Sequence, residues 1–271
     1  MSSIFSLAHL TALGLSPPEL VGVAARAGYQ KVGLRLSPSS SAGVAYPLMH
    51  DPRALEETLA RMRNTGVGVF DLEIVHIDAD FSPAKYTAFF EVGAKLGAKA
   101  MLVAGDDADE ARLTASFARL CEAAGPFGLS ADLEFMPWLK VANARTALRI
   151  VTAAAQPNGG VLVDALHVAR SATSLADIAA IPREHLHYAQ ICDAPAEIPT
   201  TVEGLLHTAR SERLLPGEGG IDLVGIFAAL PADLPVSVEI PSESQVAALG
   251  AEEWARRALT ATKRTLARIA R

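Results

Sequence analysis

Four oxygen-bearing side chains stand at the ends of four successive short apolar segments, and their types and spacing could support chemistry. They are Glu134, Asp164, Gln190 and Glu239, which end the segments LSADLE, VLVD, YAQ and VSVE. A carboxylate or amide at the end of a buried strand is unfavourable unless a partner compensates it. One divalent cation bound by all four side chains is the simplest common partner.

The spacing of these side chains is typical of a barrel. The intervals between them are 30, 26 and 49 residues. A (β/α)₈ barrel of about 250 residues advances roughly 30 residues per unit and builds its active site at the C-terminal ends of its strands. The third interval is long and contains an insertion over residues 195–222. The four side chains are therefore expected to lie together in space.

The donor types indicate which ion and which reaction to expect. Three carboxylates and an amide oxygen are hard donors that favour Mg²⁺ or Mn²⁺ over Zn²⁺. Such an ion would hold a carbonyl and a neighbouring hydroxyl oxygen, acidify the adjacent C–H and stabilise an enediolate. Reprotonation then gives isomerisation or epimerisation, and loss of a β-hydroxyl gives dehydration. The competing interpretation is that each side chain only caps its strand or meets a lysine.

Short β-rich segments alternate with helical ones along the whole chain, which predicts an α/β fold, a (β/α)₈ TIM barrel in a single domain over residues 1–271. The helical segments have recognisable boundaries, with Ser16 and Ser82 at expected starts and Gly28, Gly66 and Gly97 at expected ends. The predicted strands are Ile4–His9, Lys31–Leu36, Val67–Ile77, Lys99–Ala104, Leu129–Glu134, Val161–Asp164, Leu186–Cys192 and Val236–Ile240.

Composition narrows the class of protein. Half of the 271 residues are hydrophobic, which is ample for a large core, and the net charge of −6 argues against a nucleic-acid-binding surface. Cys121 and Cys192 are the only cysteines, so a disulfide framework is not expected. The N-terminus lacks a basic region and no apolar run approaches about 18 residues, which predicts a cytoplasmic protein without a membrane partner. A homo-oligomer is compatible with the sequence.

Five motifs resemble those of the xylose-isomerase-like TIM-barrel superfamily, which contains sugar phosphate isomerases and epimerases, 3-dehydroshikimate dehydratases and endonuclease IV. The motifs are LEFMPW (133–138), VDALH (163–167), QICDAP (190–195), LLPGEGGID (214–222) and VEIP (238–241). The resemblance implies that Glu134, Asp164, Gln190 and Glu239 bind the metal, that His167 contacts the substrate, and that Glu134 and Glu239 exchange protons with it.

Two departures from the sugar epimerases bear on the reaction. Those enzymes usually have His where this chain has Gln190, and Gln at this position resembles some bacterial 3-dehydroshikimate dehydratases. The arginine-containing loop expected after the third strand of that branch is not evident in HIDADFSP.

Further side chains could contact a substrate. His167 either hydrogen-bonds the substrate or is a satisfied histidine at the barrel rim, and Trp138 either stacks on a ring or fills that rim. Arg210 and Arg213 could clamp a carboxylate or phosphate, or form surface ion pairs. The turn Pro216–Gly220 lies where barrels bind phosphate but is also a simple turn. Near the first three strand ends, the sequence has His9, Arg35, Glu73 and His76.

The leading hypothesis is a divalent-metal-dependent isomerase or epimerase of a sugar or sugar phosphate, with Glu134, Glu239 and His167 as catalytic residues. Its partner would be a small polyhydroxylated carbonyl substrate, bound by His167, Arg210, Arg213, Trp138 and His76. A lyase of the 3-dehydroshikimate dehydratase type is the first alternative, and a non-catalytic metabolite-binding barrel is the second. An endonuclease is disfavoured, because a multi-metal site needs more histidines and because acidic charge opposes DNA binding.

Overall fold

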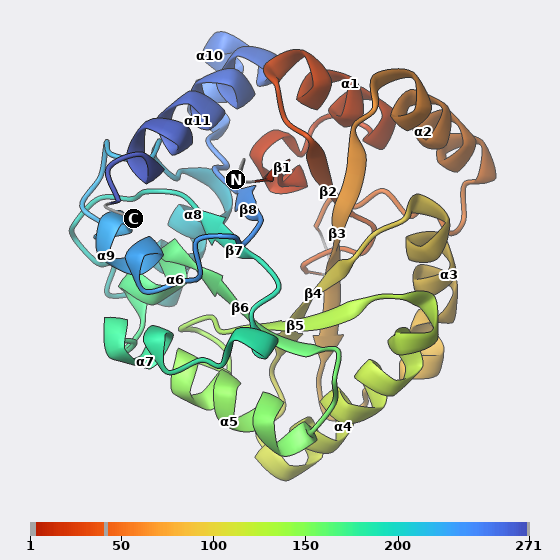
Figure 1. Ribbon diagram of the computed structural model, residues 1–271, viewed down its shortest axis with the longest axis vertical. Coiled ribbons are helices and arrows are strands. Elements are labelled where there is room, and N and C mark those ends of the chain that lie inside the picture. The colour runs from red at the N-terminus through yellow and green to blue at the C-terminus, as the bar shows by residue number, and fades with distance from the viewer. Residues whose placement is uncertain (1–3, 41–42, 270–271) are drawn as a thin grey trace.

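The computed structural model describes residues 4–40 and 43–269, and its strands close into one barrel. Strand order follows the chain from β1 to β8, and β8 pairs with β1 in parallel to complete the ring (Figure 1). The (β/α)₈ prediction is thus confirmed, and all eight predicted strands are present. They are β1 (Phe5–Leu7), β2 (Lys31–Arg35), β3 (Gly68–Ile77), β4 (Ala100–Gly105), β5 (Ser130–Glu134), β6 (Gly159–Asp164), β7 (Ala189–Ile191) and β8 (Val236–Val238).

The strands where the barrel closes are shorter than predicted. β1, β7 and β8 contain three residues each, because β8 pairs with β7 only over Ala189–Ile191 and with β1 only over Phe5–Leu7. The apolar sequence continues beyond these paired residues into other structures. His9, for example, begins a 3₁₀ helix and does not end the first strand as predicted.

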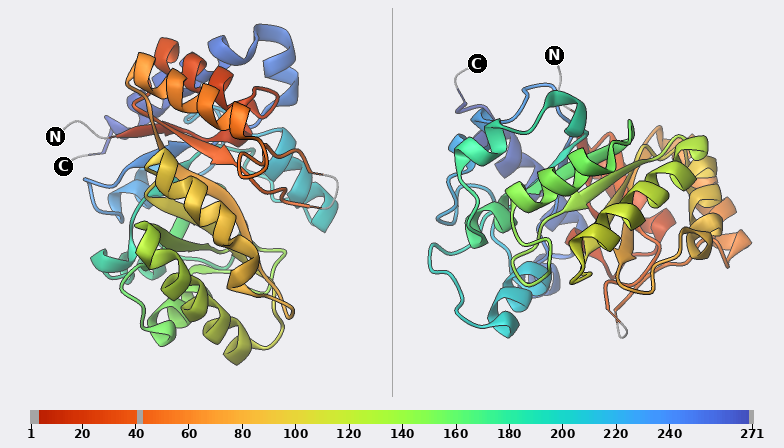
Figure 2. Two further views of the ribbon diagram at one scale, coloured as in Figure 1. Left: turned by 90° about the vertical axis from the view of Figure 1, so that its right-hand side faces the viewer. Right: turned by 90° about the horizontal axis from the view of Figure 1, so that it is seen from below.

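Helices cover the outside of the barrel (Figures 1 and 2). The α-helices are α1 (Pro17–Ala27), α2 (Pro52–Thr65), α3 (Thr87–Leu96), α4 (Glu110–Ala124), α5 (Ala144–Ala154), α6 (Ala165–Arg170), α7 (Leu175–Ala179), α8 (Val202–Ser211), α9 (Leu223–Ala228), α10 (Glu243–Leu249) and α11 (Ala251–Leu266). Four 3₁₀ helices in the described residues are η1 (His9–Ala12), η2 (Pro83–Tyr86), η3 (Gly125–Phe127) and η4 (Arg183–His185).

The predicted helix boundaries follow from local chemistry. Ser16 and Glu19 form a capping box at the start of α1, which satisfies backbone N–H groups that lack a helical partner. Gly28, Gly66 and Gly97 end α1, α2 and α3 with left-handed backbone conformations that glycine adopts without strain. Ser82 differs from the prediction, because it precedes the short helix η2 and the regular helix α3 begins only at Thr87.

The main apolar core lies between the strands and the surrounding helices, and a smaller apolar cluster fills the barrel interior. The interior cluster includes Phe70, Leu102, Leu162 and Tyr188, with the rings of Phe70 and Tyr188 packed edge to face at 5.3 Å. At the C-terminal ends of the strands, this cluster meets buried polar side chains such as Glu134, Asp164 and Gln190. The barrel is therefore a packed floor beneath a mouth that is part polar and part apolar.

A half-buried ion pair lies next to this floor. Oδ1 of Asp132 on β5 is 2.6 Å from Nδ1 of His187, which precedes β7, and the hydroxyl of Ser130 donates to Oδ2 of Asp132. Gly160 on β6 leaves room for both groups, because a Cβ atom there would lie 2.5 Å from Asp132 Oδ1.

The described residues include no helix long and apolar enough to cross a bilayer.

Candidate metal centre and active site

The four predicted metal ligands meet at the C-terminal end of the barrel. Glu134, Asp164 and Gln190 lie at or near the ends of β5, β6 and β7, and Glu239 directly follows β8. All four residues are at most 3% exposed. The parallel strands bring together residues that are up to 105 positions apart in the sequence.

Three of the potential ligands form a compact group. Glu134, Asp164 and His167 each offer a ligand atom, and these atoms lie within 4.8 Å of one another. Nε2 of His167 is 3.5 Å from Oε1 of Glu134. Gln190 and Glu239 lie side by side, because the Gln190 amide nitrogen donates to Glu239 Oε1 over 3.1 Å.

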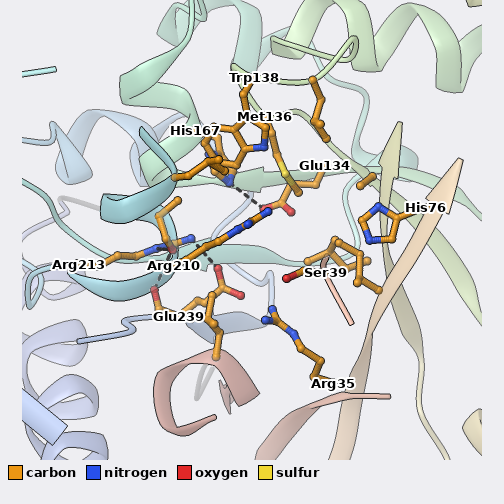
Figure 3. Close-up of a pocket in the computed structure, with 17 residues that line it drawn as sticks. Arg35, Ser39, His76, Glu134, Met136, Trp138, His167, Arg210, Arg213 and Glu239 are labelled. Atoms are coloured by element: carbon orange, nitrogen blue, oxygen red, sulfur yellow. Dashed lines mark hydrogen bonds and ion pairs between the residues drawn. The ribbon is translucent and has the colours of Figure 1, made fainter. Parts of the chain in front are cut away.

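Arg213 connects the two halves of this group. Its guanidinium donates to Oδ2 of Asp164 over 2.7 Å and lies 2.9 Å from Oε2 of Glu239, and its Nε donates to the backbone oxygen of Ala209. The side chain is only 2% exposed. The sequence predicted that Arg213 clamps a substrate or forms a surface ion pair, whereas its guanidinium contacts two predicted metal ligands, and Figure 3 shows the ion pair with Glu239.

The donor atoms fit a divalent cation. Oε1 of Glu134 and Oε1 of Gln190 are buried without a hydrogen-bond partner in the described structure. A buried polar atom without a partner is unfavourable and calls for a ligand. The Asp164 carboxylate accepts a hydrogen bond from Arg213 and the Glu239 carboxylate forms an ion pair with it, and a carboxylate oxygen engaged in this way can still coordinate an ion. The residues therefore suit a hard cation with oxygen ligands.

The pKa values of the three carboxylates in the centre shift in different directions. Burial and the neighbouring charges of Asp164 and Glu239 raise the pKa of Glu134 well above its usual range. Burial also raises the pKa of Glu239, although Arg213 opposes the shift. At Asp164, burial raises the pKa, but Arg213 and His167 outweigh it and the net shift is downward. An added cation would favour the ionised form of all three carboxylates.

His167 is neutral at physiological pH. Burial lowers its imidazole pKa to about 4, despite the opposing charge of Asp164. Its Nδ1 atom is buried and has no hydrogen-bond partner in the described part of the chain. The imidazole packs edge to face against Trp138, with ring centres 5.1 Å apart. A neutral imidazole in this place can exchange hydrogen bonds with a substrate oxygen.

The cavity next to the centre has two unlike walls (Figure 3). One wall is apolar and carries Trp138. The other is cationic, with Arg210 from α8 and Arg35 from the end of β2. The remaining apolar lining is Leu10, Ile74, Leu102, Ala104, Met136, Leu139, Leu206 and Ala209, and the polar lining includes Ser39 and His76.

All five residues that the sequence offered for substrate binding border this cavity: His167, Arg210, Arg213, Trp138 and His76. Sequence reasoning missed part of the apolar wall, notably Met136 and Leu139. The available signal was their position in the loop directly after β5, within the segment that also contains Trp138.

The backbone of the glycine-rich turn Pro216–Gly220 is bound by a carboxylate of the same chain. The backbone N–H groups of Gly217, Gly219 and Ile221 all donate to the carboxylate of Asp193 at 2.9–3.1 Å. A Cβ atom at Gly219 would lie 2.2 Å from the backbone oxygen of Ala194, so the turn requires glycine. These amides satisfy an internal carboxylate, which favours the turn over a phosphate site.

Comparison with known proteins agrees with this architecture. A family model described as a xylose isomerase-like TIM barrel matches residues 21–265. A 3-dehydroshikimate dehydratase of Pseudomonas aeruginosa is 31% identical over 161 residues, which are 58% of this chain and 25% of that protein. A dehydratase of the same name from Pseudomonas putida is 29% identical over 160 residues. The chain thus spans about a quarter of the length of these curated relatives.

Solved structures share the fold at low sequence identity. The IolI protein with a bound zinc atom superimposes with a TM-score of 0.81 at 19% identity, covering 98% of this chain and 99% of that one. A fusion of a xylose isomerase-like TIM barrel with a 4-hydroxyphenylpyruvate dioxygenase gives a TM-score of 0.78 at 22% identity. The match covers 98% of this chain and 43% of the fusion protein.

Proposed function

Because the chain belongs to the xylose isomerase-like TIM-barrel family, we propose that it is a divalent-metal-dependent enzyme acting on a small hydroxy-carbonyl compound. The observation that carries the proposal is the convergence of Glu134, Asp164, Gln190 and Glu239 with two unpartnered buried oxygen atoms. The zinc in the IolI structure and the cluster of Glu134, Asp164 and His167 support a divalent ion in general. The hard oxygen donors favour Mg²⁺ or Mn²⁺.

The ion would be held by Glu134, Asp164, Gln190 and Glu239. When bound there, it would polarise a carbonyl oxygen and make the adjacent C–H more acidic. Glu134 and Glu239 approach the cavity from β5 and from the end of β8, so they face a substrate from different directions (Figure 3). One carboxylate would accept the carbon-bound proton, and the other would deliver a proton.

We favour dehydration as the outcome. In this step a carboxylate removes the proton beside the carbonyl, the electron pair of the C–H bond becomes a carbon–carbon double bond, and the β-hydroxyl leaves with a delivered proton as water. The apolar wall around Trp138 suits the face of a carbon ring better than an open polyol, whose hydroxyls would need hydrogen-bond partners. The curated relatives named 3-dehydroshikimate dehydratase support the same outcome.

Isomerisation or epimerisation of a sugar is the second candidate, and one feature favours it. Carboxylates on two sides of the substrate can remove a proton from one face and return it to the other. Both candidate reactions begin with the same proton abstraction, so they differ only in whether the substrate then loses its β-hydroxyl or regains a proton.

The decisive assay compares both substrate types on one protein preparation. Protein supplied with Mn²⁺ or Mg²⁺ is incubated with 3-dehydroshikimate, and separately with ketoses and ketose phosphates in deuterated water. The lyase proposal expects water loss from the first substrate and the ultraviolet absorbance of an aromatic product. Deuterium incorporation beside the carbonyl of a ketose without water loss would establish the second candidate. Metal-dependent binding without turnover of any compound would favour a non-catalytic barrel.

A further inference from the structure

A second group of buried polar side chains lies inside the barrel, below the metal centre. Asp71 on β3, Tyr188 directly before β7 and Ser237 on β8 each lie two positions before a polar residue of the barrel mouth. Ser6 on β1 is the register partner of Ser237. Two residues of extended chain span about 6–7 Å and point to the same face. The four side chains therefore form one layer beneath the mouth, and we call them the interior polar group.

The surroundings of these side chains show that they face the barrel interior. Leu7 on β1 and Val238 on β8 belong to the outer core, so the serines next to them point inward. Gly33 on β2 gives the Asp71 carboxylate its room, because a Cβ atom at Gly33 would lie 2.7 Å from Asp71 Oδ2. Tyr188 belongs to the interior apolar cluster, where burial raises its pKa and the charge of Asp71 raises it further.

The oxygen atoms of the interior polar group have no hydrogen-bond partner among the described residues. This holds for both carboxylate oxygens of Asp71 and for the hydroxyls of Ser6, Tyr188 and Ser237. All four residues are at most 1% exposed. Hydroxyls in direct contact with a carboxylate would donate hydrogen bonds to it, so these oxygens are held apart from one another. Buried polar atoms without a partner are unfavourable and call for a ligand between them.

Asp71 differs from the other carboxylates around it, because no cationic side chain of the described structure pairs with it. The neighbouring acids each have such a partner, in the pairs Glu73–Arg35, Glu239–Arg213 and Asp132–His187. Burial and the negative charges of these three acids raise the pKa of Asp71 well above its usual range. An ionised Asp71 therefore needs one positive charge from outside the chain.

We propose that the interior polar group binds one monovalent alkali cation, Na⁺ or K⁺, between the carboxylate of Asp71 and the hydroxyls of Ser6, Tyr188 and Ser237. Carboxylate and hydroxyl oxygens are the hard donors that such a cation prefers. One carboxylate neutralises one positive charge, whereas a divalent ion here would leave an unbalanced charge in a closed interior. The cation would connect four strands from inside the barrel, and its binding does not depend on the proposed catalytic function.

Thermal unfolding in different salts tests this proposal. Protein is melted at pH 8 in NaCl, KCl or choline chloride at equal ionic strength, with Mn²⁺ present to occupy the metal centre. A cation that binds only the folded chain raises the melting temperature, and choline is too large for a closed interior. We expect a rise of at least about 3 °C in NaCl or KCl over choline chloride, and the more effective salt identifies the ion. Equal melting temperatures in all three salts would overturn the proposal.

Matched variants locate the cation. Asp71→Asn keeps the size of the side chain but removes its charge, so the alkali and choline salts should give melting temperatures within about 1 °C of each other. Asp80→Asn replaces an exposed carboxylate in the loop after the same strand and should keep the full difference. A full difference in Asp71→Asn would place the alkali cation elsewhere and contradict the proposal.

Two milder variants decide the question if Asp71→Asn does not fold. Tyr188→Phe and Ser237→Ala each remove a single oxygen atom and keep the rest of the side chain. The alkali concentration that gives half of the rise in melting temperature should increase at least about threefold in each variant. An unchanged half-effect concentration in both would contradict the assigned oxygen ligands.

Calorimetric titration with Mn²⁺ on the same preparation separates this proposal from the metal-dependent function. Normal Mn²⁺ binding without an alkali effect would contradict only the interior cation. An alkali effect that requires Asp71, in a protein that does not bind Mn²⁺, would contradict only the metal centre and support the interior cation.

Discussion

Glu134 has the most demanding surroundings in the metal centre. It is buried beside Asp164 and Glu239, and its Oε1 atom has no hydrogen-bond partner in the described structure. Ionised carboxylates at this density repel one another strongly when no cation is present. The free oxygen and the raised pKa of Glu134 are therefore two consequences of one arrangement, which a divalent ion would stabilise.

Replacing Glu134 with glutamine should impair ion binding and turnover together. The amide keeps the shape of the side chain but removes the charge, so we expect Mn²⁺ affinity to fall at least about tenfold by calorimetry. Turnover should fall by about 10²–10⁴, the usual contribution of a positioned proton acceptor. Glu91→Gln on the exposed face of α3 is the control. Unchanged Mn²⁺ affinity in Glu134→Gln would remove Glu134 from the ligand set.

Residue types and spacing were enough to predict the members of the site but not their pairings. Glu134, Asp164, Gln190 and Glu239 could be found because each interrupts an apolar segment at a strand end. The ion pairs of Arg213 with Asp164 and Glu239 could not be found in this way. They depend on how the long insertion after β7 folds back over the barrel, and no local pattern encodes that path.

Strand elements were predicted well where they pair over many residues and less well where the barrel closes. β3 pairs with both neighbours along most of its length, and its predicted and observed ranges differ by one residue. β7 has only three residues, although the apolar pattern around it is longer. A pattern of apolar residues indicates burial and not strand pairing. Residues past the last paired position are still buried by the helices, so the pattern extends beyond the strand.

Gly160 on β6 leaves the space that the Asp132–His187 pair occupies, because it has no side chain. A Cβ atom there would lie 2.5 Å from Asp132 Oδ1 and 2.6 Å from His187 Nδ1. Gly160→Ala should therefore destabilise the fold by about 1–3 kcal/mol, because the ion pair must move. Gly14→Ala is the matched control, since nothing lies within 4 Å of its Cβ position. Urea unfolding measures the free energy of unfolding of both variants. Equal values would show that Asp132 and His187 can shift without cost, which would contradict the prediction.

The same pair makes stability depend on pH. Burial lowers the pKa of His187, but the hydrogen bond and charge of Asp132 outweigh burial and the net shift is upward. A raised histidine pKa contributes stability that is fully present below the unfolded value of about 6.5 and is lost as pH rises through the folded value.

His187→Gln should therefore lower the free energy of unfolding most at acidic pH. The loss should be about 1–3 kcal/mol near pH 5.5 and become progressively smaller toward pH 9. Chemical unfolding across this range measures the difference, with exposed His50→Gln as the control. A difference that stays constant with pH would mean that His187 does not carry the charge assigned to it.

At the scale of the whole molecule, the metal centre joins strands that the chain connects only through long segments. Its predicted ligands come from β5, β6, β7 and the residue after β8, and these strands form half of the closed ring. An ion held by all of them binds only the folded chain, because the unfolded chain cannot assemble the ligands. Ion binding must then stabilise the entire barrel and not only its mouth.

We therefore expect Mn²⁺ at about 100 times its dissociation constant to add about 2.7 kcal/mol to the free energy of unfolding. For a barrel of this size the melting temperature should rise by roughly 5–10 °C in differential scanning calorimetry. Asp164→Asn should lose most of this rise, because it removes a charged ligand that Arg213 already orients. A rise that persists in Asp164→Asn would indicate that Mn²⁺ stabilises the protein somewhere else. A wild-type protein without any rise would contradict the metal centre and leave Asp164 and Glu239 as internal partners of Arg213.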